Sequence, residues 1–85
     1  MKNTYFEEIK LRFIEAAMWT NSNAEEGDVN RNHVNYGCCI CWARVLRDIG
    51  HETEVPVWED NGCLKIPFIK IDGEKVLDFE KSTVA

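Results

Sequence analysis

The spacing of apolar residues changes at Gly50, and this change restricts the possible folds more than any other feature of the sequence. Before Gly50, apolar residues recur every three or four positions, which is typical of amphipathic helices. After it, they alternate with polar residues, which is typical of strands with one buried face. A chain of 85 residues with 45% hydrophobic side chains is long enough for one core. The sequence therefore predicts a single α+β domain over residues 1–85.

The first helix is expected over residues 4–19. Beside its main apolar face runs a second stripe that includes Leu11 and Met18. The combined apolar arc covers more than half of the helix circumference, which is wider than an ordinary surface helix needs. Such a helix is either almost enclosed or shared between the core and a partner. The main inward face is expected to consist of Phe6, Ile9, Phe13, Ala16 and Ala17.

A polar segment and a second helix follow. Residues 20–33 are rich in turn-forming residues, so we expect a long loop there. The second helix is expected over residues 35–49, ending at Gly50, with Cys39 buried and Cys41 exposed. Its inward face is expected to consist of Cys39, Trp42, Ala43, Leu46 and Ile49.

Two short sequence signals organise the strands. Asn61-Gly62 and Asp72-Gly73 are typical of two-residue hairpin turns. Near Pro67 the apolar side chains change face, so a bulge or bend is expected there. The prediction is an ααβββ order, in which two helices precede a three-stranded antiparallel meander. The strands are expected at about residues 53–58, 63–71 and 76–79.

The charge of the chain limits its partners. Ten basic against fifteen acidic residues give a net charge of −5, which disfavours phosphate backbones and anionic membranes because both attract positive fields. A protein partner with a basic surface fits better. No segment reaches the roughly 20 apolar residues of a membrane span, and the start of the chain does not resemble a secretory signal. We therefore expect a cytoplasmic protein without a cofactor.

The four cysteines are unevenly spaced. Cys38, Cys39 and Cys41 are crowded together and only Cys63 lies far away, whereas secreted scaffolds space cysteines to link distant loops. Reduced thiols are therefore expected. Cys38 and Cys41, with Cys63 and His33, are an alternative zinc set. Structural zinc sites normally use two separated ligand pairs, however, and the second pair is missing, so no metal is expected.

Residues 37–79 resemble a shortened transglutaminase-like, papain-fold core. The residues that carry the resemblance are Gly37-x-Cys39, Ala43, Leu46, Gly50, Ile69-Lys70-Ile71-Asp72-Gly73 and Val76-Leu77-Asp78. The resemblance implies a nucleophilic cysteine at Cys39, followed by a histidine and an aspartate on strands. The chain departs from this pattern because Ile66 stands about where the histidine belongs. An alternative site would therefore use Cys39, His33 and Asp78.

Two surfaces outside the expected loop are candidates for partner binding. The apolar edge of the first helix suits a hydrophobic contact or a homodimer. The first strand and its tip combine acids with an aromatic residue, which suits a basic partner. The candidate residues are Leu11 and Met18 on the helix and Glu52, Glu54, Trp58, Glu59 and Asp60 on the strand.

The expected loop is a third candidate, with Glu25, Glu26 and Asp28. Taken together, the patterns favour a small acidic binding protein without enzymatic activity, which inhibits another protein. Phage-encoded inhibitors of host defence, of the anti-CRISPR kind, and immunity proteins against toxins are classes with this size and charge. The alternative is a minimal transglutaminase-like cysteine enzyme that uses Cys39.

Overall fold

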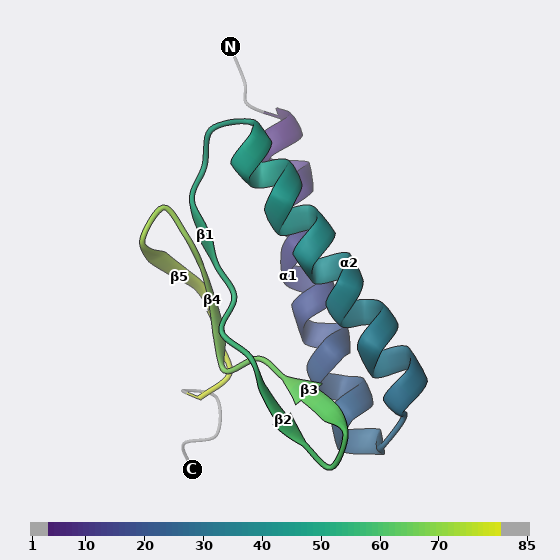
Figure 1. Cartoon of the computed structure of the whole chain (residues 1–85). Helices are drawn as coiled ribbons and strands as arrows, with labels where there is room; N and C mark the ends of the chain where they lie inside the picture. Colours follow the sequence, from purple (N-terminus) through teal and green to yellow (C-terminus); the bar gives the residue numbers. More distant parts are fainter. Residues whose placement is uncertain (1–3, 81–85) are drawn as a thin grey trace.

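The computed structural model describes residues 4–80, which form two long helices packed against a thin layer of strands (Figure 1). Helix α1 spans Thr4–Glu26 and helix α2 spans Val29–Asp48. The two helices run antiparallel and are joined by a turn at residues 27–28. Gly27 adopts a positive φ of 75° there, and the Asp28 carboxylate then accepts a hydrogen bond from Arg31 N at 3.1 Å. This aspartate therefore caps the first turn of α2.

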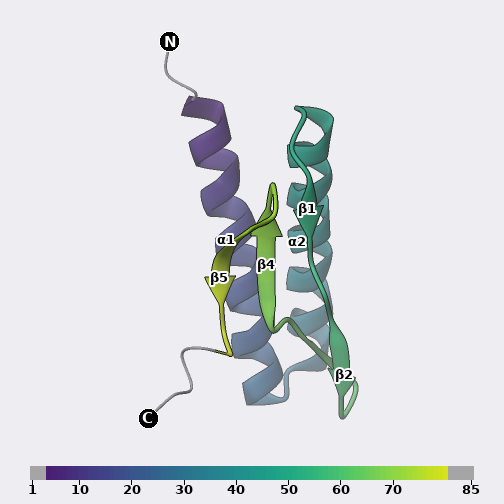
Figure 2. The same ribbon diagram turned by 90° about the vertical axis from the view of Figure 1, so that its left-hand side faces the viewer.

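Five short strands follow the helices. They are β1 (Thr53–Glu54), β2 (Trp58–Asp60), β3 (Cys63–Lys65), β4 (Phe68–Ile71) and β5 (Glu74–Asp78). One antiparallel sheet has the order β1-β4-β5, and β2 and β3 form a separate two-stranded hairpin. In Figure 2 the three-stranded sheet covers one side of the helix pair, with β5 over α1 and β1 over α2. The α+β class is thus confirmed.

The single three-stranded meander is corrected to two small sheets. Each of the first two expected strands is divided, and each division contains a proline, Pro56 or Pro67. Proline lacks the N–H that a sheet ladder needs, so pairing stops where it occurs. The bend expected near Pro67 is confirmed, because it separates β3 from β4.

Both expected hairpin turns are confirmed. Asn61 and Gly62 have φ values of 55° and 85°, and they connect β2 to β3. Asp72 and Gly73 have φ values of 53° and 83°, and they connect β4 to β5. Two consecutive residues with positive φ match the right-handed twist of the flanking strands, which explains why Asn-Gly and Asp-Gly are favoured.

The loop expected over residues 20–33 is wrong, because this segment is helical except for the turn at residues 27–28. Some of its polar residues face the interior, since Thr20, Asn23 and Asn32 are buried, whereas others such as Glu25 and Glu26 are exposed. Thr20 Oγ1 donates to Ala16 O at 2.7 Å, within its own helix. Buried polar groups that find partners are compatible with a helix interior.

The core lies between the helix pair and the strands, and most of the expected inward positions contribute to it. Cys39 is buried and Cys41 is exposed, as expected. Ile49 is instead 48% exposed, because α2 ends one residue earlier and Ile49 occupies the cap. The buried cluster consists of Phe13, Ala16, Ala17, Cys39, Ala43, Leu46, Ile66, Ile69 and Ile71.

Candidate functional site

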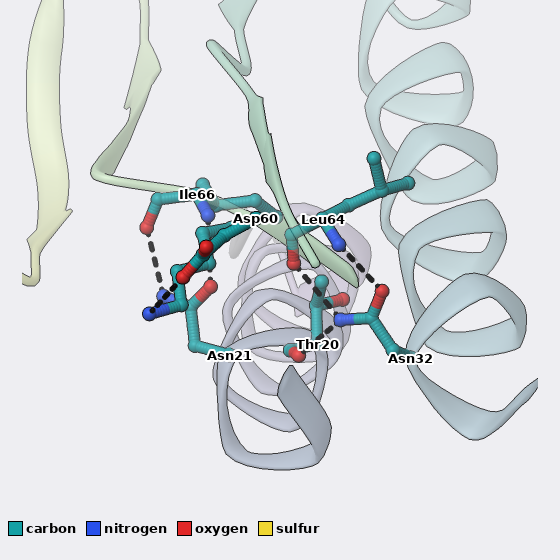
Figure 3. Close-up of polar contacts among 7 residues, drawn as sticks. Thr20, Asn21, Asn32, Asp60, Leu64 and Ile66 are labelled. Atoms are coloured by element: carbon teal, nitrogen blue, oxygen red, sulfur yellow. Dashed lines mark hydrogen bonds and ion pairs between the residues drawn. The ribbon is translucent and has the colours of Figure 1, made fainter. Parts of the chain in front are cut away.

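Two asparagine side chains attach the β2–β3 hairpin to the helices (Figure 3). Asn32 Nδ2 donates to Leu64 O at 2.9 Å, and Asn32 Oδ1 accepts from Leu64 N at 2.7 Å. Asn21 makes the same pair of bonds with Ile66, both at 2.8 Å. Each side-chain amide thus binds one backbone N–H and one C=O, as a neighbouring strand would. The inner edge of β3 is satisfied by side chains, and the hairpin is held in a defined position.

The other strand of this hairpin faces solvent. All three residues of β2, Trp58, Glu59 and Asp60, are exposed. Asp60 Oδ2 lies 3.4 Å from Lys65 Nζ, and the turn is held by His33 Nε2, which donates to Gly62 O at 2.9 Å. The hairpin therefore presents one tryptophan and two carboxylates from a strand that is anchored through its partner.

A hollow of about 370 Å³ lies beside Trp58, between the hairpin, the last turns of α1 and the end of β5. Pro67 and the half-buried Phe79 contribute apolar surface to it, and Trp58 is 55% exposed at its side. Its volume falls within the range of roughly 300–1,000 Å³ that is typical of ligand sites. The hollow is therefore large enough to receive part of another molecule.

The structure separates the acidic residues expected to act together. Glu52 and Glu54 are exposed near β1, whereas Trp58 belongs to β2, and Figure 1 shows these strands at different heights along the helix pair. Glu54 Oε1 also lies 3.9 Å from Lys70 Nζ. Of these strand candidates, only Trp58 lines the hollow, and Glu59 and Asp60 follow it along β2.

The apolar edge of α1 is exposed, as a partner surface requires. Leu11 is 57% exposed, Met18 50% and Trp19 58%. The third candidate surface, the expected loop, does not exist as a loop. Glu25 and Glu26 belong to the last turn of α1, and Asp28 caps α2. Of these acids, Glu25 lines the hollow beside Trp58.

The alternative catalytic residues do not provide an activated thiol. Cys39 is fully buried, and its burial, with a smaller contribution from Cys38, raises the pKa of the Cys39 thiol to about 12. A nucleophilic cysteine needs the opposite shift, because the thiolate is the reactive form. His33 uses Nε2 to bind Gly62, and Asp78 Oδ2 lies 3.3 Å from Lys75 Nζ.

The alternative zinc ligands are not assembled either. Cys38 and Cys41 are exposed on α2, whereas Cys63 is buried at the start of β3. Within residues 4–80, no three His, Cys, Asp or Glu side chains come close enough together to hold a metal ion. All four cysteines are free thiols in this structure.

One polar cluster was not anticipated from the sequence. His51 Nδ1 donates to Asp72 Oδ2 at 2.7 Å, and the His51 ring stacks on Phe6 with ring centres 4.4 Å apart. The bond from His51, and then one from Glu52 N, hold the pKa of Asp72 below its usual value. The cluster ties the second hairpin turn to the segment after α2 and to the start of α1.

Little in the sequence indicates the hollow. The sequence predicts a binding role for Trp58, but it places Pro67 and Phe79 only in strands and Asn21 in a loop. The one signal was the change of face near Pro67, which breaks the strand where the hollow lies.

Neither helix in the described part of the chain combines the length and apolar character needed to cross a membrane. Comparisons with family models, with curated proteins and with solved structures found no match. The resemblance of residues 37–79 to a transglutaminase-like core therefore stays a prediction.

Proposed function

We propose that this chain is a non-enzymatic binding protein that inhibits another protein by attaching to it through the surface around Trp58. The observation that carries the proposal is a tryptophan, 55% exposed, beside a hollow of about 370 Å³. Tryptophan is enriched among the residues that dominate binding energy, and such residues fit partly preformed pockets. The hairpin that presents it is anchored through β3, so little order has to be gained on binding.

The charge of the protein supports a basic partner. The net charge is −5, and Glu59 and Asp60 extend from the same exposed strand as Trp58. Acidic groups around an aromatic anchor accelerate encounter with a positive surface and disfavour negative partners. We therefore propose a protein with a basic surface as the partner, and neither nucleic acid nor a membrane.

Two biological classes fit this proposal. Phage-encoded inhibitors of host defence, of the anti-CRISPR kind, and immunity proteins against toxins both use small acidic domains to cover basic active sites. Either role places the protein in the cytoplasm, where its free thiols stay reduced.

The proposal is tested by capturing the partner from a lysate of the host cells with the tagged protein and with two matched variants. Trp58→Ala removes the proposed anchor, whereas Trp19→Ala removes a tryptophan of similar exposure, 58% against 55%. We expect the partner to be lost with Trp58→Ala, to be retained with Trp19→Ala, and to elute as salt rises. Loss with Trp19→Ala alone would move the binding surface to α1 and refute the proposal.

The exposed stripe on α1 is a second candidate surface, for a homodimer. Leu11, Met18 and Trp19 are each at least half exposed, which is unusual for large apolar side chains on one helix. Sedimentation equilibrium of the wild type and of Met18→Lys tests this. A concentration-dependent dimer that Met18→Lys abolishes would support the contact, and a monomer at all concentrations would exclude it.

A further inference from the structure

We infer that the hollow beside Trp58 is a specificity site for one arginine side chain of the protein partner. The inference rests on the proposed function, because it assumes that a basic protein docks on this surface. It goes further by naming the chemical group that enters the hollow.

The inner surface of the hollow suits the aliphatic part of a long side chain. Ile66 and Pro67 are buried at its base, and Phe79 and Trp58 contribute aromatic surface. Asn21, which also lines the hollow, already binds both backbone polar groups of Ile66. The base is therefore apolar and fixed before any ligand arrives, which lowers the entropic cost of binding.

The charges around the hollow favour a cation. Glu25 and Glu80 contribute two carboxylates and Lys65 one ammonium group, so the lining carries a net charge of −1. Lys65 Nζ in turn lies 3.4 Å from Asp60 Oδ2. Including Asp60, three acids face one base and the local charge is −2. Glu25 comes from α1 and Glu80 follows β5, so the two carboxylates come from separate parts of the fold.

Arginine fits this arrangement better than lysine. Its planar guanidinium stacks on an aromatic face and can bind carboxylates through paired N–H groups, whereas the lysine ammonium is a compact, strongly hydrated charge. Tryptophan gives the strongest cation–π attraction of the aromatic residues. The combination of Trp58 with one carboxylate on α1 and another just after β5 therefore matches both properties of the guanidinium.

The test is an NMR titration of the full chain with N-acetyl-arginine amide. Binding is read from the indole N–H signals, which are assigned with Trp58→Phe and Trp19→Phe. We expect a saturable, millimolar shift of the Trp58 signal and little change at Trp19. N-acetyl-citrulline amide has nearly the same shape without the charge, and should bind at least about fivefold more weakly if the carboxylates contribute about 1 kcal/mol. N-acetyl-lysine amide should lie between the two.

Two neighbouring glutamates supply the matched control. Glu25 lines the hollow and Glu26 does not, although both are exposed at the end of α1. Glu25→Gln should weaken binding of N-acetyl-arginine amide about threefold or more, while Glu26→Gln should leave it nearly unchanged. Equal binding of the citrulline compound, or equal effects of the two variants, would overturn the inference.

The outcome separates this inference from the proposed function. If Trp58→Ala still abolishes partner capture but N-acetyl-arginine amide causes no shift at Trp58, the arginine site is refuted and the binding surface stands. If Trp58→Ala leaves capture of the partner intact, the proposed function is refuted. A shift of the Trp58 signal in the wild-type protein would then show only that the hollow binds a cation.

Discussion

Replacing Asn32 with alanine should destabilise the protein strongly, because its side chain connects the β2–β3 hairpin to both helices. Asn32 is fully buried, and its amide binds both backbone groups of Leu64 and also donates to Thr20 O at 2.7 Å. In the alanine variant, the N–H and C=O groups of Leu64 both lose the Asn32 amide as their hydrogen-bond partner. Thr20 O lies within α1 and keeps the hydrogen bond of its helix.

The magnitude follows from the two groups left unpaired. An unsatisfied buried donor or acceptor costs about 1–3 kcal/mol, and Leu64 is only partly buried, so we expect a loss of about 3 kcal/mol. A domain of this length has a free energy of unfolding of about 4–13 kcal/mol. At about 4–8 °C per kcal/mol, the melting temperature should fall by about 12–24 °C.

The assay is thermal and urea unfolding followed by circular dichroism, with Asn35→Ala as the control. Asn35 belongs to the same helix, but its side chain bonds only to Arg31 O, one turn earlier. Its removal should cost less than about 0.5 kcal/mol, because alanine also favours the helix. If Asn32→Ala costs no more than Asn35→Ala, the hairpin is not held by this amide and the reasoning fails.

Asn32→Asp refines the same test. The carboxylate can still accept from Leu64 N–H but cannot donate to the carbonyl of Leu64, and its charge is buried. Burial raises the pKa of such a carboxyl group, so the deficit should be largest at neutral pH and should shrink as pH falls through that pKa. A deficit that does not change with pH would show that water reaches the site.

Three further predictions test other parts of the structure. Iodoacetamide at pH 8 should modify the two exposed cysteines of α2 within minutes and Cys39 only after denaturation, since burial raises its pKa to about 12; mass spectrometry of the native protein checks this. Because the pKa of Asp72 is lowered in the folded state, its contribution to stability is present at neutral pH and lost as pH falls through the folded pKa. Asp72→Asn keeps the turn geometry and should therefore show a smaller drop in urea midpoint between pH 6 and pH 3 than the wild type. Gly62→Ala, at a φ of 85°, should lower stability by about 1 kcal/mol. Gly37→Ala, in open space within α2, should raise it by up to about 1 kcal/mol, and calorimetry compares the two.

The parts of the fold set by local sequence were predictable. The change of apolar spacing at Gly50 divides helices from strands, and both hairpin turns follow from residues that tolerate positive φ. The burial of Cys39 followed from helical spacing alone. In each case the deciding interactions lie within a few positions along the chain.

The extent of the helices was not predictable in the same way. Asn21 and Asn32 are typical of turns when judged locally, yet both lie in helices, where their amides meet backbone groups of Ile66, just after β3, and of Leu64 in β3. Asn21 and Ile66 are separated by 45 residues and Asn32 and Leu64 by 32. A local pattern contains no information about partners that distant.

Only part of the candidate site could be predicted, again because local patterns do not reveal contacts between distant residues. The sequence predicts a role for Trp58 because an aromatic residue among acids suits a basic partner. The hollow beside it also needs Phe79 and Glu25, which three-dimensional packing brings from the end of β5 and from α1. Glu54 and Trp58 were expected on one continuous strand, but the strand is interrupted around Pro56, so they lie on β1 and β2.

The two strands of the hairpin have different roles: β3 attaches the hairpin to the helices, and β2 faces solvent. Backbone groups of β3 and of Ile66 receive the asparagine amides, so the identity of the side chains on β2 matters little for that attachment. All three β2 residues, Trp58–Asp60, face solvent. Exchanging them should change what the protein recognises while leaving its melting temperature almost constant, so β2 is a natural place to redirect this scaffold towards a new target.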